Sequence, residues 1–463
     1  MQLVAYGMQD VYLTGNAQIT FFKHLYRRHT NFSVEAVEQT FQSNSTSFGN
    51  RMVAVISRNG DLLHRLWLEV NLKQEEDYND GTAQGSTKKN GVGYVNDLGH
   101  ALIKSAEVEI GGQKIDQTYG RFQHLWHKLS CKGEKEIGYD IMSGNGGDDR
   151  DVIPVPQLAD ADNDRVMEKN FSKARKLFIP INFFFSKGNA GAALPLIALQ
   201  YHEVRVTIEL ADRSDILRAF NGDKAKGTVG YQKLSSESHI ASMVDQPKLF
   251  SDFFYLDTDE RKRFSQMSHE YLIEQLQFTG SEVTRELSNN AVTPFTMRLN
   301  FNHPTKAIYW TAEDSALNEQ IPYPFYNGHK TVRANIPMVH TKVSAGEYED
   351  LALNCPIDKV GLNLNGHERF TVRDGEYFWL CQPYQHHTRI PYDHWLGMYS
   401  FCLSPEEFQP SGALNFSRID NASLKLDFKM AQENGRHRTV YVYAVNYNVL
   451  RILSGMGGLA FSN

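Results

Sequence analysis

Cysteine is scarce in this sequence, and the few cysteines present lie far apart. Four occur among 463 residues, and no two of them form a C-x-x-C pair. This spacing excludes a zinc ribbon and a thioredoxin-like redox site. We expect thiols that are free and mostly buried, as is usual in a reducing cytosol.

A basic excess and long apolar runs are also lacking. The formal net charge is −6 and the pI about 6.3, which argues against a protein whose main task is to bind nucleic acid. No run of 18 or more apolar residues occurs, so no membrane-spanning helix is predicted. Residues 1–23 lack the basic start and apolar core of a secretory signal. We therefore expect the chain to be made and to assemble in the cytosol.

The familiar catalytic motifs are missing as well. There is no phosphate-binding G-x-x-x-x-G-K-[ST] loop, no G-x-S-x-G turn and no H-E-x-x-H zinc helix. Paired carboxylates such as Glu406 and Glu407 lie in polar stretches, where we expect solvated side chains. The sequence therefore assigns no catalytic or cofactor-binding residue, and it predicts that the protein is not an enzyme.

Two segments resemble metal sites without meeting their requirements. The D-x-D-x-D stretch at 160–164 begins like a calcium loop, but Arg165 stands where the loop needs glycine and Phe171 where it needs glutamate. His386 and His387 are adjacent, and neighbouring residues of an extended segment point to opposite faces. They are poor joint ligands for that reason. A solvated acidic loop and a surface loop are expected, and no metal ligand is assigned.

Short alternating segments divided by turn residues are abundant. Apolar and polar side chains alternate over 106–110, 204–210 and 439–445, a period typical of strands that bury one face. The 27 Phe and 22 Tyr suit the pleated surface of a sheet. Gly111–Gly112 and Asn365–Gly366 follow such segments and predict antiparallel hairpins.

Few helices are expected. Residues 121–131 place Phe122, Leu125, Trp126 and Leu129 at helical spacing, which predicts an amphipathic helix. Residues 259–267 predict a short charged helix or turn. The polar, irregular segments are predicted to be long loops at the ends of a strand-rich scaffold. They are 73–97, 132–173, 211–247 and 311–347.

The two halves of the chain show a weak internal duplication. Segments 108–115 and 361–370 each predict a strand, a glycine turn and a second strand. Segments 199–206 and 414–421 occupy comparable late positions in the two halves. Coincidence is the competing interpretation, since any two hairpins look alike.

A true duplication predicts an all-β chain with two antiparallel sandwiches. Eight short strands in each unit would be the jelly-roll solution to protecting sheet edges. The predicted divisions are an N-terminal arm over 1–25, a first domain over 26–258, a linker over 259–268 and a second domain over 269–463.

A short basic run at 23–29 is interleaved with aromatic residues. It contains Lys23, Arg27 and Arg28, which could contact nucleic acid or an anionic membrane surface. A charged rim where the arm meets the first domain is the competing interpretation, because the run is so short.

Five Asn-x-Ser/Thr sequons occur, at Asn31, Asn44, Asn170, Asn415 and Asn421. Such asparagines carry glycans only if the chain meets the glycosylation machinery. Without a secretory signal we expect these possible N-glycosylation sites to be unmodified.

Long strings from one end of the chain to the other are specific enough to suggest a family. They include LVAYGMQDVYLTGN at 3–16, ISRNGDL at 56–62, LPLIALQYHEV at 194–204, HEYLIEQLQFTG at 269–280 and NYNVLRILSGMGGLAF at 446–461. These strings closely resemble the major capsid proteins of nucleocytoplasmic large DNA viruses, of the chlorella-virus, iridovirus and marseillevirus type.

The resemblance implies a double jelly roll, two eight-stranded antiparallel β-sandwiches side by side with long loops. It implies a homotrimer of pseudo-hexagonal outline that tiles an icosahedral shell over an internal membrane. The implied partners are neighbouring capsomers, minor capsid and penton proteins, and the internal membrane, which the N-terminal arm would contact. Sequence-specific nucleic-acid binding is not expected. The implied location is the virion, after assembly in the host cytoplasm, with Lys23, Arg27 and Arg28 on the inner face.

The loops depart from that family pattern, and two other functions compete. Residues 132–173, 211–247 and 311–347 do not match it, so host attachment and glycan decoration are not carried over. A carbohydrate-binding or carbohydrate-cleaving jelly roll is the first alternative, and it would need paired carboxylates in a cleft or an aromatic platform. A scaffold for the inner membrane or genome, based on Tyr26, Arg27 and Arg28, is the second.

Overall fold

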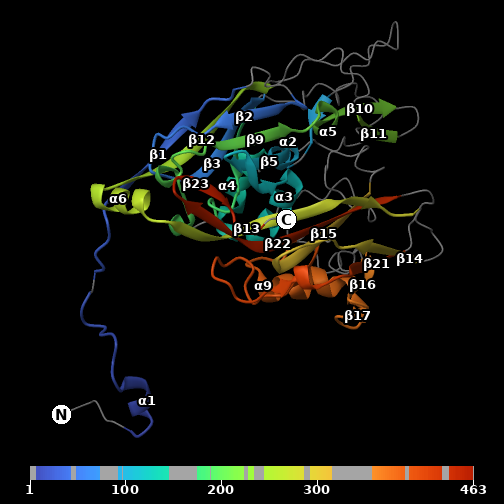
Figure 1. Cartoon of the computed structure of the whole chain (residues 1–463). Coiled ribbons are helices and arrows are strands. Elements are labelled where there is room, and N and C mark those ends of the chain that lie inside the picture. The colour runs from blue at the N-terminus through green and yellow to red at the C-terminus, as the bar shows by residue number, and fades with distance from the viewer. Residues whose placement is uncertain are drawn as a thin grey trace.

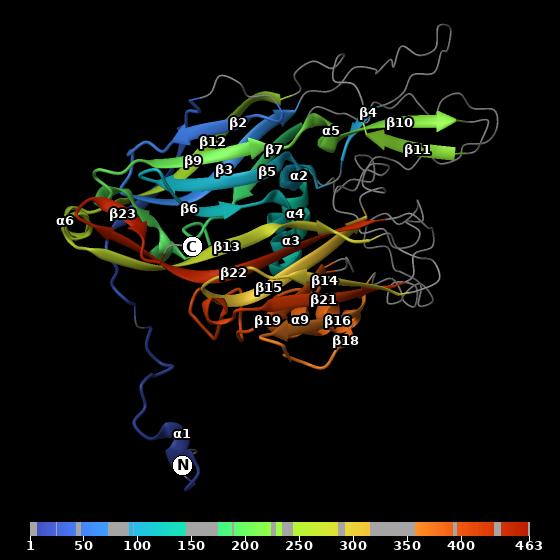
Figure 2. The same ribbon diagram turned by 45° about the vertical axis from the view of Figure 1, so that its right-hand side comes forward.

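The computed structural model shows two β-sandwiches, with helices packed between them and an N-terminal arm that extends away from the body (Figures 1 and 2). It describes residues 7–24, 26–42, 48–72, 92–95, 97–144, 175–187, 189–223, 228–233, 244–285, 292–314, 357–391, 396–429 and 437–461. All strand pairs among these residues are antiparallel.

The first sandwich is built from two facing sheets. One sheet has the order β1 (Phe32–Gln39), β12 (Val244–Leu256), β3 (Leu62–Leu72) and β7 (Arg175–Ile181), with the short β8 (Leu194–Pro195) beside β3. The other has the order β2 (Arg51–Val55), β9 (Val204–Leu210), β5 (Ile103–Ile110) and β6 (Gln113–Thr118). Numbered along the chain, these eight main strands lie in the orders 1-8-3-6 and 2-7-4-5.

The second sandwich repeats that arrangement. Its first sheet has the order β13 (His269–Val283), β22 (Arg438–Leu453), β15 (Pro304–Asp314) and β19 (Leu396–Ser400), and β20 (Leu414–Asn415) and β23 (Met456–Leu459) join it. Its second sheet has the order β14 (Thr293–Arg298), β21 (Ala422–Phe428), β16 (Ile357–Leu364) and β17 (His367–Glu368), with β18 (Arg373–Asp374) beside β16. The strand orders are again 1-8-3-6 and 2-7-4-5. The predicted duplication and the double jelly roll are both confirmed.

The first pair of segments that the sequence comparison matched forms equivalent hairpins in the two sandwiches. The β5–β6 turn places Gly111 and Gly112 at φ 59° and 82°, and the β16–β17 turn places Asn365 and Gly366 at φ 51° and 82°. Tight hairpins require such positive φ angles, which glycine and asparagine tolerate best. The second suspected pair, segments 199–206 and 414–421, was aligned incorrectly. Leu414 begins a short strand and a 3-10 turn whose counterpart begins at Leu194, not Leu199.

Among the described residues, three large apolar cores and a small fourth cluster of Leu62, Ala193 and Phe254 hold the body together. Each sandwich has its own, and the third lies between them, where α3 (Gly120–Ser130) packs on the outer face of the β13-β22-β15-β19 sheet. Phe122, Leu125 and Leu129 of α3 contact a surface that includes Tyr309 and Tyr443. Full burial of a large apolar side chain contributes about 1.5–3 kcal/mol, so this third core fastens one sandwich to the other.

The two predicted helices are present, and several others were missed. The predicted helix at 121–131 is α3, and the predicted helix at 259–267 is α6 (Thr258–Gln266), where the Asp257 side chain accepts a hydrogen bond from the Glu260 N–H at 3.0 Å. The unpredicted helices are short: α1 (Asp10–Thr14), α2 (Leu98–Leu102), α4 (Gly133–Ser143), α5 (Arg213–Ile216) and α9 (Gln382–His386), the last preceded by a π turn (Tyr377–Cys381).

The loop predictions were partly wrong. The predicted loop 132–173 begins with α4, which was missed because its two glycines weaken the helical signal. The predicted loop 211–247 contains α5, β10 (Leu217–Asp223) and β11 (Thr228–Lys233). These strands form a separate small sheet with β4 (Val92–Tyr94), and their many polar residues hide the alternation. Residues 311–314 belong to β15, and the rest of that predicted loop lies outside the described residues.

We predict that Gly120→Ala destabilises the protein by about 3 kcal/mol, because overpacking at a closed position forces the backbone apart. A Cβ at Gly120 would overlap the carbonyl oxygens of His100 and Ile103, where α3 begins against α2. Gly138→Ala is the matched control, since it lies in α4 with nothing within 4 Å of an added Cβ. It should be neutral or stabilising by up to roughly 1 kcal/mol. Urea unfolding of both variants tests this, and equal stabilities would contradict it.

Candidate functional site

Ion pairs join the two halves of the chain across the interface between the sandwiches. Lys187, which follows β7, contacts Glu274 of β13 with an Nζ–Oε2 distance of 2.7 Å. Arg121 of α3 donates two hydrogen bonds to Glu313 of β15, at 2.6 and 2.8 Å. The Glu274 and Glu313 side chains are only 5% and 2% exposed. Buried pairs of this kind orient the elements that carry them, because separating them would leave an unpaired charge inside the protein.

A buried lysine extends the first of these pairs. Lys306 of β15 is fully buried, and its ammonium contacts Glu274 and donates to the Glu407 carbonyl oxygen at 2.9 Å. Burial lowers the pKa of Lys306, whereas Lys187 and Lys306 together outweigh burial and hold the pKa of the Glu274 carboxyl below its usual value. Glu274 therefore stays ionised between two cations, an arrangement suited to holding strands together.

Asp116 of β6 is a buried carboxyl at the same interface. It accepts hydrogen bonds from the Gln117 N–H at 2.9 Å and the Phe184 N–H at 3.2 Å. Burial raises its pKa to about 7, although the charge of Lys187 opposes the rise. A carboxyl with a raised pKa is a candidate acid or base when it lies in a cleft. Asp116 is 7% exposed and does not line the pocket described next, so its contacts indicate a structural role.

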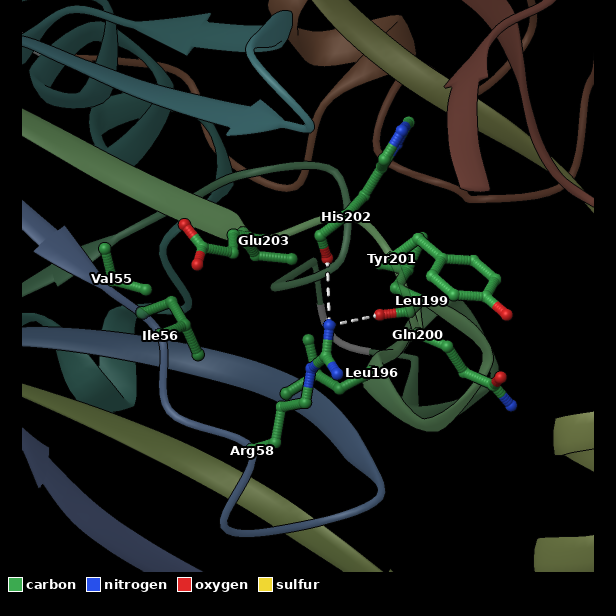
Figure 3. Close-up of a pocket in the computed structure, with 10 residues that line it drawn as sticks. Val55, Ile56, Arg58, Leu196, Leu199, Gln200, Tyr201, His202 and Glu203 are labelled. Atoms are coloured by element: carbon green, nitrogen blue, oxygen red, sulfur yellow. Dashed lines mark hydrogen bonds between the residues drawn. The ribbon is translucent and has the colours of Figure 1, made fainter. Parts of the chain in front are cut away.

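A pocket of about 370 Å³ lies in the first sandwich between two of the strings that carry the family resemblance (Figure 3). Figure 3 shows the Arg58 guanidinium reaching across it to the carbonyl oxygens of Leu199 at 2.6 Å and His202 at 3.3 Å. The arginine thereby fastens the loop before β9. Glu203 is the one carboxylate in the lining, so this pocket lacks the carboxylate pair that the carbohydrate-cleaving alternative requires.

The expected surface loop at the histidine pair was wrong, and so was the expected solvation of the neighbouring carboxylate. His386 ends helix α9, and the His387 side chain is 0% exposed. His386 Nδ1 lies 2.9 Å from the Leu403 carbonyl oxygen, whereas His387 Nδ1 lies 2.7 Å from Glu406 and its Nε2 3.1 Å from the Tyr309 hydroxyl. The two rings thus face different partners. Glu406 was expected to be solvated, but it is held by His387, and these bonds keep its pKa lowered even though burial alone would raise it.

The sequence-predicted surface residues are exposed wherever the structure describes them. Lys23 on the N-terminal arm is exposed, and so are Arg27 and Arg28 just after the arm. The sequon residues Asn31, Asn415 and Asn421 are exposed as well. Asn44 and Asn170 lie outside the described residues, as does the calcium-like stretch at 160–164. Glycosylation and contacts of the basic run stay predictions.

The expectation of mostly buried thiols was wrong for the described cysteines. Cys402 is buried, Cys131 is half-buried and Cys381 is exposed. The reason is local, since Cys131 and Cys381 lie at helix ends rather than on the inner face of a strand. No helix in the described part of the chain is long and apolar enough to cross a membrane.

One group of possible metal ligands escaped the sequence analysis. Asp97, His100 and His124 offer ligand atoms that all lie within 4.8 Å of one another. A D-x-x-H spacing at the start of α2 was a signal for the first two residues, but nothing in the sequence connected them with a histidine in α3.

Comparison with known families identifies the function of this double sandwich. A profile described as "Major capsid protein N-terminus" matches residues 20–257, and one described as "Large eukaryotic DNA virus major capsid protein" matches residues 260–458. The chain belongs to the major capsid proteins of large eukaryotic DNA viruses. It is therefore a structural subunit of the icosahedral capsid of a large DNA virus, and this family of capsid proteins is not an enzyme family.

Individual capsid proteins agree over the whole length. The chain is 41% identical to the major capsid protein of Pyramimonas orientalis virus and 37% identical to that of Paramecium bursaria Chlorella virus 1, covering all of this chain and 99% of each relative. The crystal structure of VP54 of PBCV-1 superposes with a TM-score of 0.72 at 31% identity, covering 96% of this chain and all of that one. The Faustovirus major capsid protein shares the fold at a TM-score of 0.70 and 14% identity.

We predict that the stability of the capsid protein carries a pH dependence from Asp116. Because the pKa of this carboxyl is raised in the folded protein, the group stabilises the fold below its unfolded value and loses that contribution as the pH rises through about 7. Asp116→Asn keeps the shape without the charge. The free energy of unfolding of the variant minus that of the wild type should therefore increase by about 2 kcal/mol from pH 5 to pH 8. Urea unfolding at both pH values measures it, and a pH-independent difference would refute the assignment.

Proposed function

We propose that three copies of the chain form a homotrimer of pseudo-hexagonal outline, and that this capsomer tiles the shell. The observation that carries the proposal is that both sandwiches have the same strand orders, 1-8-3-6 and 2-7-4-5. A chain with two similar sandwiches presents two similar outer edges, so three chains around an axis present six. Units with near-sixfold edges can cover a surface with few kinds of contact between neighbouring capsomers.

The ties between the sandwiches support this role. A pseudo-hexagonal outline requires a fixed angle between the two halves of each chain. Arg121–Glu313, Lys187–Glu274 and the apolar face of α3 all cross that interface. Interfaces within one chain permit relative motion unless they are extensive and apolar, and this one combines an apolar core with buried ion pairs.

The domain division that we propose follows the sequence boundaries. The arm is residues 1–25, the first jelly roll 26–258, the linker 259–268 and the second jelly roll 269–463. Helix α6 lies in this linker, between β12 and β13. The linker thus connects the last strand of one sandwich to the first strand of the next.

We further propose that the N-terminal arm lies on the inner side of the shell and contacts minor capsid proteins and the internal membrane. Tyr12 is 92% exposed and Phe22 is 98% exposed, although both are large apolar residues. Exposed apolar surface of this kind is typical of a segment that is buried by a partner. Lys23, Arg27 and Arg28 add positive charge beside it, which suits an anionic membrane surface. Penton contacts and assembly in the host cytoplasm complete the proposal.

The proposed homotrimer predicts the native mass of the purified protein in solution. Each chain has a mass of 52.8 kDa, so the particle should have a mass of about 158 kDa. Light scattering coupled to gel filtration measures this mass without assuming a shape. A stable monomer at micromolar concentration would contradict an obligate homotrimer.

A second prediction separates the arm from the trimer. Deletion of residues 1–25 should leave three chains in each particle but prevent closed shells, because none of the arm residues that the structure describes, 7–24, belongs to an apolar core. Electron microscopy of particles made in infected or co-expressing cells measures shell formation. A second variant, with Lys23, Arg27 and Arg28 changed to Glu, tests the charge of the basic run, of which the deletion removes only Lys23. Normal particles from the deletion would refute the role of the arm.

A further inference from the structure

The cluster of Asp97, His100 and His124 lies beside the interface between the sandwiches but takes no part in the ion pairs described above. Asp97 precedes α2, His100 lies within it, and His124 lies in α3. The two histidines are each 2% exposed and so are buried, and the Asp97 side chain beside them is 12% exposed. Burying two imidazoles and a carboxylate together is costly unless each polar atom has a partner.

The orientation of His100 points to a missing partner. Its Nε2 lies 2.9 Å from the Tyr139 hydroxyl of α4, whereas its Nδ1 is buried without a hydrogen-bond partner among the described residues. A histidine that binds a metal through one nitrogen characteristically directs its other N–H to an oxygen that fixes the ring. Tyr139 stands in that orienting position, which leaves the Nδ1 lone pair for a ligand.

The distances and the backbone are compatible with a first-row metal ion. Asp97 Oδ1 and His124 Nδ1 are 3.5 Å apart, close to the separation of about 3.3 Å between two ligands of a tetrahedral zinc ion. Asp97 also holds a left-handed backbone conformation, at φ 51° and ψ 38°, which is uncommon for a residue other than glycine. Strained backbone of this kind concentrates at functional positions.

We propose that Asp97, His100 and His124 bind a transition-metal ion, of which Zn²⁺ fits the donor set best, with a water molecule completing the coordination. Two nitrogens and one carboxylate suit zinc and its neighbours, whereas Ca²⁺ and Mg²⁺ require mostly oxygen ligands. The role is structural, because the ion would join α2 of the first sandwich to α3, whose opposite face packs on the second.

Cobalt binding to the full-length protein tests the site directly. After removal of bound metal with EDTA and dialysis, we expect about one Co²⁺ per chain, with visible absorption of a low-coordinate nitrogen and oxygen site, displaced by Zn²⁺ but not by Mg²⁺. Zn²⁺ should also raise the thermal unfolding midpoint of the stripped protein. Absence of a saturable Co²⁺ signal in the wild type would overturn the proposal without the need for any variant.

Two conservative variants and two controls locate the ion. Asp97→Asn removes the charged ligand and should weaken Co²⁺ binding by at least tenfold. Tyr139→Phe removes only the orienting hydroxyl, retains an aromatic ring that can stack on His127, and should weaken binding by about tenfold. His367→Gln and Asp374→Asn alter exposed residues of the second sandwich and should bind as the wild type does. Equal affinity in Asp97→Asn and wild type would overturn the assignment, and so would loss of binding in either control.

Discussion

Docking of helix α3 between the two sandwiches is the interaction on which the rest of the molecule depends. Its apolar face packs on Tyr309 and Tyr443 of the second sandwich, and its first residue approaches the carbonyl oxygens of His100 and Ile103 in the first. Arg121, at the start of the helix, reaches Glu313 and stacks over the ring of Tyr441 at 3.7 Å. Because one short helix contacts both halves, the angle between the halves is set by side-chain packing rather than by the linker. A subunit that must repeat its outline many times in a shell needs that kind of restraint.

Buried charge at this interface favours specificity over raw stability. Replacing a buried ion pair with well-packed apolar residues is often neutral or stabilising, whereas removing one partner typically costs about 3–5 kcal/mol. Glu274 lies between Lys187 and Lys306. Any arrangement of the sandwiches that separates these three groups would therefore have a higher free energy. An apolar interface alone would tolerate sliding of one sheet on the other. The ion pairs specify one register, and the third apolar core stabilises it.

Much of the fold was readable from the sequence because its strands alternate and its hairpins carry glycine. The Gly111–Gly112 and Asn365–Gly366 turns identified equivalent hairpins in both halves, and the apolar spacing of Phe122, Leu125 and Leu129 identified α3. Other features depend on tertiary contacts that no local pattern records. Glu406 lies in a polar stretch but is held by a histidine 19 positions away in the chain. Asp97 and His124 meet only because α2 packs against α3, and the paired strands β10 and β11 carry too few apolar residues to alternate visibly.

The C-terminal hairpin has a consequence for how the chain is made. Leu450 and Ile452 belong to the core of the first sandwich, and β23 lies so close to it that a side chain at Gly457 would meet Leu199 at 2.7 Å. The Tyr201 N–H also donates to the Gly455 carbonyl oxygen at 3.0 Å. The strands of the N-terminal sandwich are thus translated before the β22–β23 hairpin, which supplies part of the cover of its core. A chain without this hairpin would expose apolar residues of its first sandwich, so completion of one half of the subunit depends on residues about 200 positions further along the chain.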